Sequence, residues 1–542
     1  MLTQAVQRRS APVLMESART RARAVYALWI ACLLALFGLH FVHLLADFPN
    51  NSPWMDYSKY TDEGWYASAA IRYWLNGHWF LRGDFNPAVA LPVWPILMGI
   101  VFRFTGVSLL AVRGTAVAIF GVNLLLSYRI LRTQAARWVA LLAISLLVSS
   151  PFLFAFSRLA ILEPLVTCFQ LLSWDLALRM RGASGRARTL LPAGIGIVLC
   201  LIVLTKTTGL VLIPSSLFLL AASCRNRGDA LRALAVASAA GSAAWCAWFF
   251  GAVRPHHLAD FHYFFHANTW QRPEGWMGHV LAYWYALHGM FWISRILSIC
   301  ALALLALWLI PVRGRAASGE AGVESLPLWR DRIAITCLLA AGGYLFCIGW
   351  QNHDEPRYYE TIIYPLCWLL ALGVAALVSR LRALPFRIAG VAALVVLAGV
   401  SARGTGTIVG YVRHPEYTWL GTARGIAQYI QTHPGPNRVV LSISGDELSL
   451  VTRMPAICDD FGSWDLAYRI HVYQPSWYAA WNDLDPGTVD DLSTQYTLEQ
   501  VASFNAFDDP DRNVLVLYRM IPLPPARQNF NAREEEQDNV GK

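Results

Sequence analysis

The sequence Thr61-Asp62-Glu63-Gly64-Trp65-Tyr66 places two adjacent carboxylates shortly after the first long apolar segment of the chain, Val25–Leu45. Holding such a pair at a membrane surface is costly, and this cost favours a functional role. Aromatic side chains prefer the boundary between lipid and water. They surround the pair here: Trp54, Tyr57, Tyr60, Trp65, Tyr66, Tyr73, Trp74 and Trp79. The pair is therefore predicted to lie at the depth of lipid head groups.

The composition is that of a membrane protein with many spans. Of the 542 residues, 56% are hydrophobic and 15% are charged, whereas a soluble protein carries about 25% charged residues. The net charge of +9 does not indicate nucleic-acid binding, because most arginines lie in short loops between apolar segments, as cytoplasmic loops do. Nine of the ten cysteines lie in or beside apolar segments, which excludes a disulfide framework. No cleavage site follows the first apolar segment, which is therefore predicted to remain as an anchor.

Arginine placement predicts about eleven spans with a cytoplasmic N-terminus. The apolar piece Asn86–Phe104 contains three prolines and would invert every later loop if it crossed the membrane. We therefore interpret it as a juxtamembrane or re-entrant piece of the first outer loop. The predicted spans are Val25–Leu45, Leu109–Leu131, Trp138–Pro151, Ile161–Met180, Leu190–Thr205, Leu210–Cys224, Leu231–Val253, Tyr285–Ile310, Ile333–Trp350, Tyr359–Val378 and Phe386–Gly404.

This topology sorts the loops by chemistry. Arginine-rich loops face the cytoplasm, and four stretches with unusual polar residues face outward: 48–85, 157–163, 206–209 and 351–358. The last part of the chain is more polar, with an amphipathic helix expected at Thr418–Thr432 and strands expected at Arg438–Ser444 and Asn513–Tyr518. The predicted domains are a cytoplasmic segment (1–24), a transmembrane catalytic domain (25–405), an extracytoplasmic α/β domain (406–525) and a disordered tail (526–542).

The outward-facing acids are candidates for proton transfer. Asp62 or Glu63 could accept a proton from an incoming hydroxyl group as a general base. The alternative is an acidic first turn of a helix, which the helix dipole favours without any catalytic role. Glu163 precedes Pro164 at the expected start of another helix, and simple helix capping is the favoured explanation when this residue is taken by itself.

The outward-facing cations are candidates for phosphate binding. Lys206 is one of only three lysines and lies in the sequence Thr205-Lys206-Thr207-Thr208-Gly209. Its ammonium group suits a phosphate oxygen, although a lysine that snorkels at a helix end is the simpler alternative. Arg357 can bind phosphate in a bidentate manner, and the adjacent Tyr358 can donate a hydrogen bond, unless this stretch is merely a charged loop.

Two histidines of the long outer loop, His262 and His266, share one helical face. This spacing suits a divalent metal ion, but a third ligand is not obvious. Histidines at the membrane interface are the commoner explanation. The need for a metal or another cofactor is therefore left open.

Two acids facing two or three cations at a lipid surface suit a sugar donor linked to a polyprenyl phosphate. The phosphate leaves with growing negative charge, which fixed cations stabilise. A base must take the proton of the attacking hydroxyl group, and in-line attack at the anomeric carbon inverts its configuration. A transporter or flippase of a lipid-linked sugar is the alternative. It is expected to carry charges at mid-membrane depth and two related halves, and the sequence shows few such charges and no such symmetry.

The same motifs resemble those of a known family. The order Asp62-Glu63, Arg158 to Glu163-Pro164, Thr205-Lys206 and Arg357-Tyr358 with Pro365 looks like that of the GT-C glycosyltransferases. It is closest to the bacterial branch related to the family 39 dolichyl-phosphate-mannose protein mannosyltransferases and to the lipid A aminoarabinose transferases. The resemblance covers roughly residues 25–405.

The resemblance implies a hexosyl- or pentosyltransferase of the bacterial cytoplasmic (inner) membrane, with its active site on the periplasmic side. Asp62 would be the catalytic base, and Glu63 and Glu163 would orient the acceptor or the sugar. The phosphate of a polyprenyl-phosphate-linked sugar would be held by Lys206 and Arg357, with Tyr358 and Arg158. The sugar remains open, as does the hydroxyl acceptor, which is a lipid, a protein or a polysaccharide.

Overall fold

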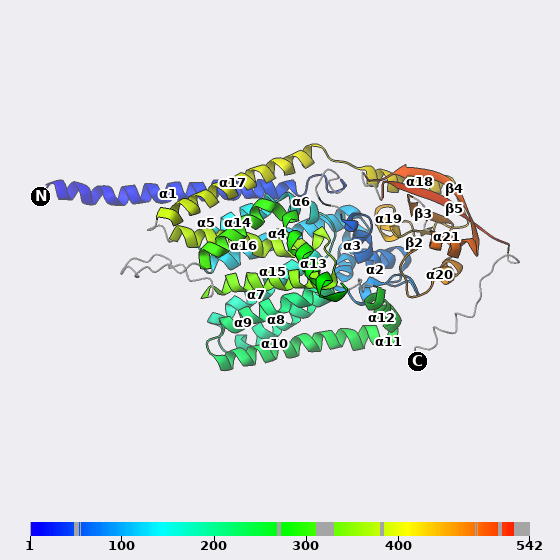
Figure 1. Ribbon diagram of the computed structural model, residues 1–542, viewed down its shortest axis with the longest axis horizontal. Coiled ribbons are helices and arrows are strands. Elements are labelled where there is room, and N and C mark those ends of the chain that lie inside the picture. The colour runs from blue at the N-terminus through cyan, green and yellow to red at the C-terminus, as the bar shows by residue number, and fades with distance from the viewer. Residues whose placement is uncertain are drawn as a thin grey trace.

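The computed structural model describes residues 2–47, 54, 56–267, 273–309, 330–379, 384–482, 484, 486–507 and 512–524. It shows a long helical body with a small sheet at one end (Figure 1). The predicted disordered tail, residues 526–542, lies outside the described residues.

Eight helices of the described chain are long and apolar enough to cross a membrane. They are α1 (Leu2–Leu39), α4 (Leu109–Arg132), α8 (Ala187–Thr205), α10 (Arg227–Trp248), α14 (Met290–Leu309), α15 (Arg332–Gln351), α16 (Glu360–Ser379) and α17 (Leu384–Arg413). Shorter helices occupy the other three predicted spans: α5 (Arg137–Val148), α7 (Glu163–Arg179) and α9 (Ile213–Ser223). The chain is therefore a multi-pass membrane protein, as predicted.

Several boundaries differ from the prediction, among them the end of α17, which continues past Gly404 to Arg413. α1 is continuous from Leu2, so the segment predicted to precede the first span extends that helix. The span predicted to begin at Tyr285 begins at Met290 instead. The chain turns at Gly289, where a Cβ atom would lie 2.1 Å from the hydroxyl oxygen of Tyr359. A larger residue at this position would therefore collide with the Tyr359 side chain.

The span that contains α16 forms the centre of the helical body, because 89% of its most apolar window is buried. Buried side chains of α5, α7, α14 and α15 pack around it in one large apolar cluster. This burial holds the loop just before α16 in a fixed place, and that loop carries Arg357 and Tyr358.

The loop between α1 and α4, which we call the first outer loop after its predicted side, forms two helices that pack against each other, α2 (Asp62–Asn76) and α3 (Val93–Thr105). α2 ends at Gly77, whose φ of 82° is the left-handed conformation that commonly terminates helices. α3 has 13 residues and buries Trp94, Met98 and Phe102, so it is short for a span. This short length agrees with the prediction that Asn86–Phe104 does not cross the membrane, while its place in an outer loop stays a prediction.

Further short helices connect these elements. They are α6 (Pro151–Phe156), α11 (Arg254–His256), α12 (Leu258–Ala267) and α13 (Gly275–His288), with 3-10 turns at Tyr57–Lys59, Pro87–Val89, Met180–Gly182, Thr207–Leu212 and Pro356–Tyr359 and a π-helical turn at Phe249–Val253.

The C-terminal part is a small α/β unit around a five-stranded sheet of order β2-β1-β3-β5-β4. Its strands are β1 (Val440–Leu441), β2 (Ala456–Ile457), β3 (Trp477–Trp481), β4 (Tyr496–Asn505) and β5 (Val514–Pro522). β1 is parallel to β2 and β3, and β5 is antiparallel to β3 and β4. The predicted helix Thr418–Thr432 is α18, whereas only Val440–Leu441 of the first predicted strand is extended.

Helices cover both faces of this sheet because alternate residues of a strand point to opposite faces. Trp477 and Ala479 pack with α18 and α19 (Gly445–Thr452). Tyr478 and Ala480 pack with α20 (Leu466–Tyr473) and α21 (Pro486–Ser493).

A buried charge network fixes the α/β unit to the first outer loop. Arg72 of α2 lies 2.8 Å from Asp84 and 3.2 Å from Asp446, which belongs to α19. Arg469 of α20 lies 3.1 Å from the other oxygen of Asp84. All four side chains are buried, so breaking one pair would leave a charge without compensation. The network therefore positions α2, which begins with the acidic pair.

Gly64 allows α19 to pack directly on α2. A Cβ atom here would lie 2.2 Å from the backbone nitrogen of Glu447. Gly64→Ala is expected to lower the unfolding free energy by about 1–3 kcal/mol, the usual cost of overpacking, measured as a lower melting temperature in detergent. Gly421→Ala, in α18 with nothing within 4 Å of its Cβ position, is the control and should be neutral or stabilising. Equal effects of the two changes would refute the close approach.

Candidate active site

The adjacent carboxylates of Asp62 and Glu63 lie in different surroundings. Asp62 and Glu63 form the first turn of α2, and both are buried, with 3% and 0% exposure. Consecutive residues of an α-helix are about 100° apart around its axis. The helix dipole favours acids at this end, but it does not require them to be buried, so their partners decide their roles.

Asp62 faces the guanidinium group of Arg357. Its Oδ2 lies 3.3 Å from Nε of Arg357, and its Oδ1 lies 3.3 Å from the hydroxyl of Thr61, which donates to it. Among the described residues, Oδ2 of Asp62 accepts no well-aligned hydrogen bond. Burial raises the pKa of Asp62, while the charge of Arg357 opposes that rise. A buried carboxylate whose pKa is raised is a suitable proton acceptor.

Arg357 is held by a second acid, Asp56. One oxygen of Asp56 lies 2.5 Å from Nη1 of Arg357, and the other accepts the backbone N–H of Arg357 at 2.9 Å. Glu355 lies 3.7 Å from the same Nη1 atom. Burial, together with the neighbouring charge of Asp56, raises the pKa of Glu355 above its ordinary value. The guanidinium group is therefore fixed by acids on one edge.

Lys206 comes to the same place from another part of the chain. α8 ends at Thr205, and the extended backbone of Lys206 directs its ammonium group to an ion pair with Glu163, the first residue of α7. Lys206 Nζ also lies 4.1 Å from the centre of the Tyr358 ring, and Cζ of Arg357 lies 5.1 Å from that centre. Two cations from distant segments therefore meet at one aromatic ring, as cation–π contacts allow.

Five of the predicted site residues thus lie in one buried cluster: Asp62, Glu163, Lys206, Arg357 and Tyr358. Its acids and cations are supplied by α2, the start of α7, the end of α8 and the turn before α16. The cluster holds nearly equal numbers of opposite charges.

Glu63 belongs to a different set of contacts. Both its oxygens bind Arg113 of α4, at 2.8 and 2.5 Å, and one also accepts the backbone N–H of Ala160 at 2.8 Å. Arg113 in turn donates to the carbonyl oxygens of Leu44 and Ala46. This arrangement ties the first outer loop to α4 and to the segment that follows α1, and it leaves Glu63 little capacity for a substrate.

Arg158 also lies apart from Lys206 and Arg357. It donates to the carbonyl oxygens of Val42 and His43, at 2.8 and 2.5 Å, and its guanidinium carbon lies 4.5 Å from the centre of the Phe154 ring. With Arg113 it lines a separate hollow of about 230 Å³. The structure therefore does not bring Arg158 to the cation pair at Tyr358.

Two buried acids were not predicted as site residues. Asp56 binds Arg357. The only feature that marks it in the sequence is that it is a third acid in the aromatic-rich stretch that contains Asp62 and Glu63. Glu360 begins α16, has 0% exposure, and neither of its oxygens has a hydrogen-bond partner among the described residues. An acid at the start of an apolar helix indicates a functional site. Glu360 could therefore have been predicted as a site residue from the sequence.

The structure gives no support to a metal site at the predicted histidines. His262 and His266 lie exposed on α12. In the described part of the chain, no three His, Cys, Asp or Glu side chains are placed to hold a metal ion together. These two exposed histidines therefore do not make a metal site by themselves.

The fold and this cluster together define a multi-pass membrane protein of the GT-C fold with buried acids and cations at one end of its helices. The crystal structure of ArnT from Cupriavidus metallidurans bound to undecaprenyl phosphate aligns with a TM-score of 0.60 over 91% of this chain and 98% of that chain, at 16% identity. The apo structure of that ArnT aligns with a TM-score of 0.61 over 92% and 98%, at 15% identity.

The two alignments cover nearly the whole of both chains, so the likeness extends over the helical body and the C-terminal unit. At this level of identity the likeness concerns the fold. It confirms the GT-C architecture that the motifs predicted. No protein-family model matches the sequence, and no curated protein matches it.

Proposed function

We propose that this protein is an inverting glycosyltransferase that moves a sugar from a polyprenyl-phosphate donor to a hydroxyl acceptor. The observation that carries the proposal is the meeting of Lys206 and Arg357 at the ring of Tyr358, beside the buried carboxylate of Asp62. Phosphate recognition and base catalysis need this combination of groups in one place.

The two cations retain donors for a phosphate. An ammonium group has three N–H donors, and Lys206 uses one of them on Glu163. Arg357 uses Nη1 for Asp56 and Nε for Asp62, and among the described residues no hydrogen bond or ion pair uses its Nη2. Both cations can therefore contact a phosphate while their carboxylate partners keep them in place.

In the proposed reaction, Asp62 accepts the proton of the acceptor hydroxyl as the oxygen attacks the anomeric carbon. The bond between that carbon and the donor phosphate oxygen breaks, and its electrons leave with the phosphate. Lys206 and Arg357 stabilise the negative charge that develops there. Attack from the side opposite the phosphate inverts the anomeric configuration. Glu163 positions Lys206, and Tyr358 places its ring under both cations.

The choice of donor is supported by the structural neighbour. The ArnT structure that shares this fold contains undecaprenyl phosphate, and a lipid-linked donor suits a site at the end of apolar helices. We further propose that the site and the C-terminal unit face the outside of a bacterial inner membrane, because the arginine-rich loops lie toward the other end. The acceptor is a hydroxyl group of a lipid, a protein or a polysaccharide.

The proposal is tested by transfer in liposomes. The purified protein should move label from a polyprenyl-phosphate sugar to an added hydroxyl acceptor with inversion at the anomeric carbon. Lys206→Gln and Arg357→Gln are each expected to raise the KM for the donor by about 10- to 100-fold, because each removes a charge-assisted hydrogen bond. Arg424→Gln removes the same charge from the exposed face of α18, and it should leave transfer unchanged.

A transporter would give a different result in the same liposomes. Label would then cross the bilayer while still bound to the polyprenyl phosphate, and no glycosidic product would form. That outcome, or equal KM values for Lys206→Gln and Arg424→Gln, would refute the proposed function.

A further inference from the structure

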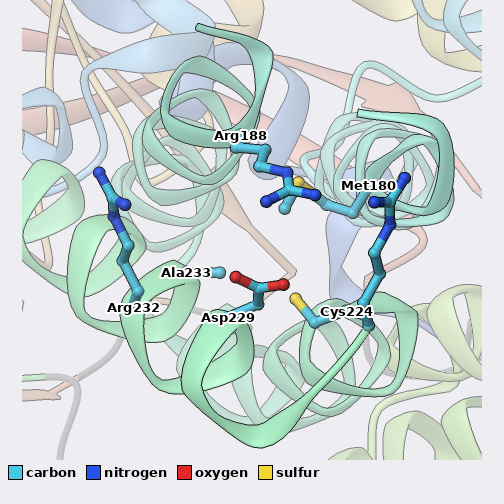
Figure 2. Close-up of a pocket in the computed structure, with 7 residues that line it drawn as sticks. Met180, Arg188, Cys224, Asp229, Arg232 and Ala233 are labelled. Atoms are coloured by element: carbon cyan, nitrogen blue, oxygen red, sulfur yellow. The ribbon is translucent and has the colours of Figure 1, made fainter. Parts of the chain in front are cut away.

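A basic hollow lies at the other end of the helical body. The space around it, open solvent included, is about 420 Å³, and the residues that line it are Met180, Arg188, Cys224, Arg225, Asp229, Arg232 and Ala233 (Figure 2). Arg188 comes from α8, Arg225 from the connection between α9 and α10, and Arg232 from α10. Three segments thus bring arginines to one opening that contains a single acid.

These arginines are not neutralised by the protein. In the described part of the chain, none of the three guanidinium groups forms an ion pair with a carboxylate. Asp229 is instead bound to Asn226, which donates to its carboxylate at 3.2 Å and accepts its backbone N–H at 2.8 Å. Three neighbouring positive charges repel each other, and an anion between them would remove that repulsion.

The hollow opens beside apolar surface. Leu190 follows Arg188 by two residues and is 67% exposed, and Leu231 precedes Arg232 and is 69% exposed. Both leucines belong to helices that are apolar enough to cross a membrane. A ligand with a phosphate group and acyl chains could therefore place the phosphate among the arginines and lay the chains along α8 and α10.

The hollow and the candidate active site lie at opposite ends of α8. α8 has 19 residues, which corresponds to about 28 Å at 1.5 Å per residue, close to the thickness of the hydrocarbon core. Arg188 is the second residue of α8, and Lys206 directly follows its last residue. The hollow and the proposed donor site therefore lie at opposite ends of one span and cannot hold the same phosphate.

We propose that this hollow binds the phosphate of an anionic phospholipid in the leaflet opposite to the candidate active site. Basic pockets between membrane helices are suited to such head groups. Arg188, Arg225 and Arg232 contact the phosphate, and Asp229 weakens the binding by repulsion. This site is independent of the proposed transfer reaction.

The test is binding of fluorescent phosphatidylglycerol to the purified full-length protein in neutral detergent. Arg232→Gln is expected to weaken binding about fivefold, the contribution of one basic residue near an anionic membrane surface. The triple change of Arg188, Arg225 and Arg232 to Gln should weaken it about a hundredfold. Asp229→Asn should tighten binding, because it removes the only acid of the hollow without changing the size of the side chain.

Arg227→Gln is the matched control. Arg227 is exposed and lies five residues before Arg232 on the same helix, but it does not line the hollow. If Arg227→Gln and Arg232→Gln weaken phosphatidylglycerol binding equally, the lipid is attracted by general surface charge, and the proposal is overturned. Equal binding of phosphatidylcholine, or equally strong competition by soluble glycerol phosphate, would overturn the assignment to an anionic lipid. Unchanged melting temperatures confirm that the single variants are folded.

Discussion

Asp62→Asn is expected to lower kcat for sugar transfer by about a hundredfold to ten-thousandfold while the protein stays folded. Loss of a general base typically costs this much. Asn has the shape of Asp and can still accept the hydroxyl hydrogen of Thr61, but it cannot take a proton. The KM for the donor should change much less than kcat, because Lys206 and Arg357 remain. The measurement is steady-state transfer in liposomes, with the melting temperature as the control for folding.

The pH profile of the wild-type protein should report the same carboxylate. Burial raises the pKa of Asp62 above its ordinary value of 3.8, and a base acts only when it is deprotonated. The acid limb of kcat/KM should therefore lie above pH 3.8, with activity falling as the pH decreases through the raised pKa. This limb should be absent from the residual activity of Asp62→Asn. If Asp62→Asn transfers sugar as fast as the wild type, Asp62 is not the base.

Glu63→Gln is expected to destabilise the protein by about 3–5 kcal/mol, the usual cost of breaking a buried ion pair by removing one partner. Glu63 and Arg113 are both buried and joined by two hydrogen bonds. The amide keeps the shape of the carboxylate but leaves the guanidinium charge without compensation. The expected result is a clearly lower melting temperature in detergent, with transfer per folded molecule less affected than in Asp62→Asn.

A double change tests whether the lost charge pair is the cause. Replacing both Glu63 and Arg113 by Met removes the two charges together, so it should cost less than Glu63→Gln alone. Recovery should be partial, because the carbonyl oxygens of Leu44 and Ala46 and the N–H of Ala160 lose their partners. If Glu63→Gln is as stable as the wild type but transfers poorly, Glu63 contacts the substrate instead of supporting the fold.

Much of the architecture could be predicted because it depends on local patterns. Apolar length and arginine placement indicated the spans, and three prolines indicated that Asn86–Phe104 stays in the outer loop. The predicted membrane side of each loop also indicated that Asp62, Lys206 and Arg357 lie at the same end of the helices. These signals are readable because a lipid environment restricts which segments can cross it.

Partner choice inside the cluster could not be predicted. Asp62 and Glu63 are neighbours in sequence, yet one faces Arg357 and the other faces Arg113, and only the packing of α2 decides which. Glu163 was interpreted separately from Lys206, although the two form an ion pair. Asp56 was not predicted as a site residue because its partner lies 301 positions away in the sequence. Such pairings depend on tertiary contacts that no local pattern encodes.

An experimental structure of the full chain with undecaprenyl phosphate bound would test the proposed donor site most directly. The phosphate is expected within about 2.7–3.2 Å of Lys206 Nζ and of the Arg357 guanidinium group, on the side of the Tyr358 ring that faces Asp62. A phosphate bound at Arg158, or one that leaves both Lys206 and Arg357 in contact with carboxylates alone, would contradict the proposed donor site.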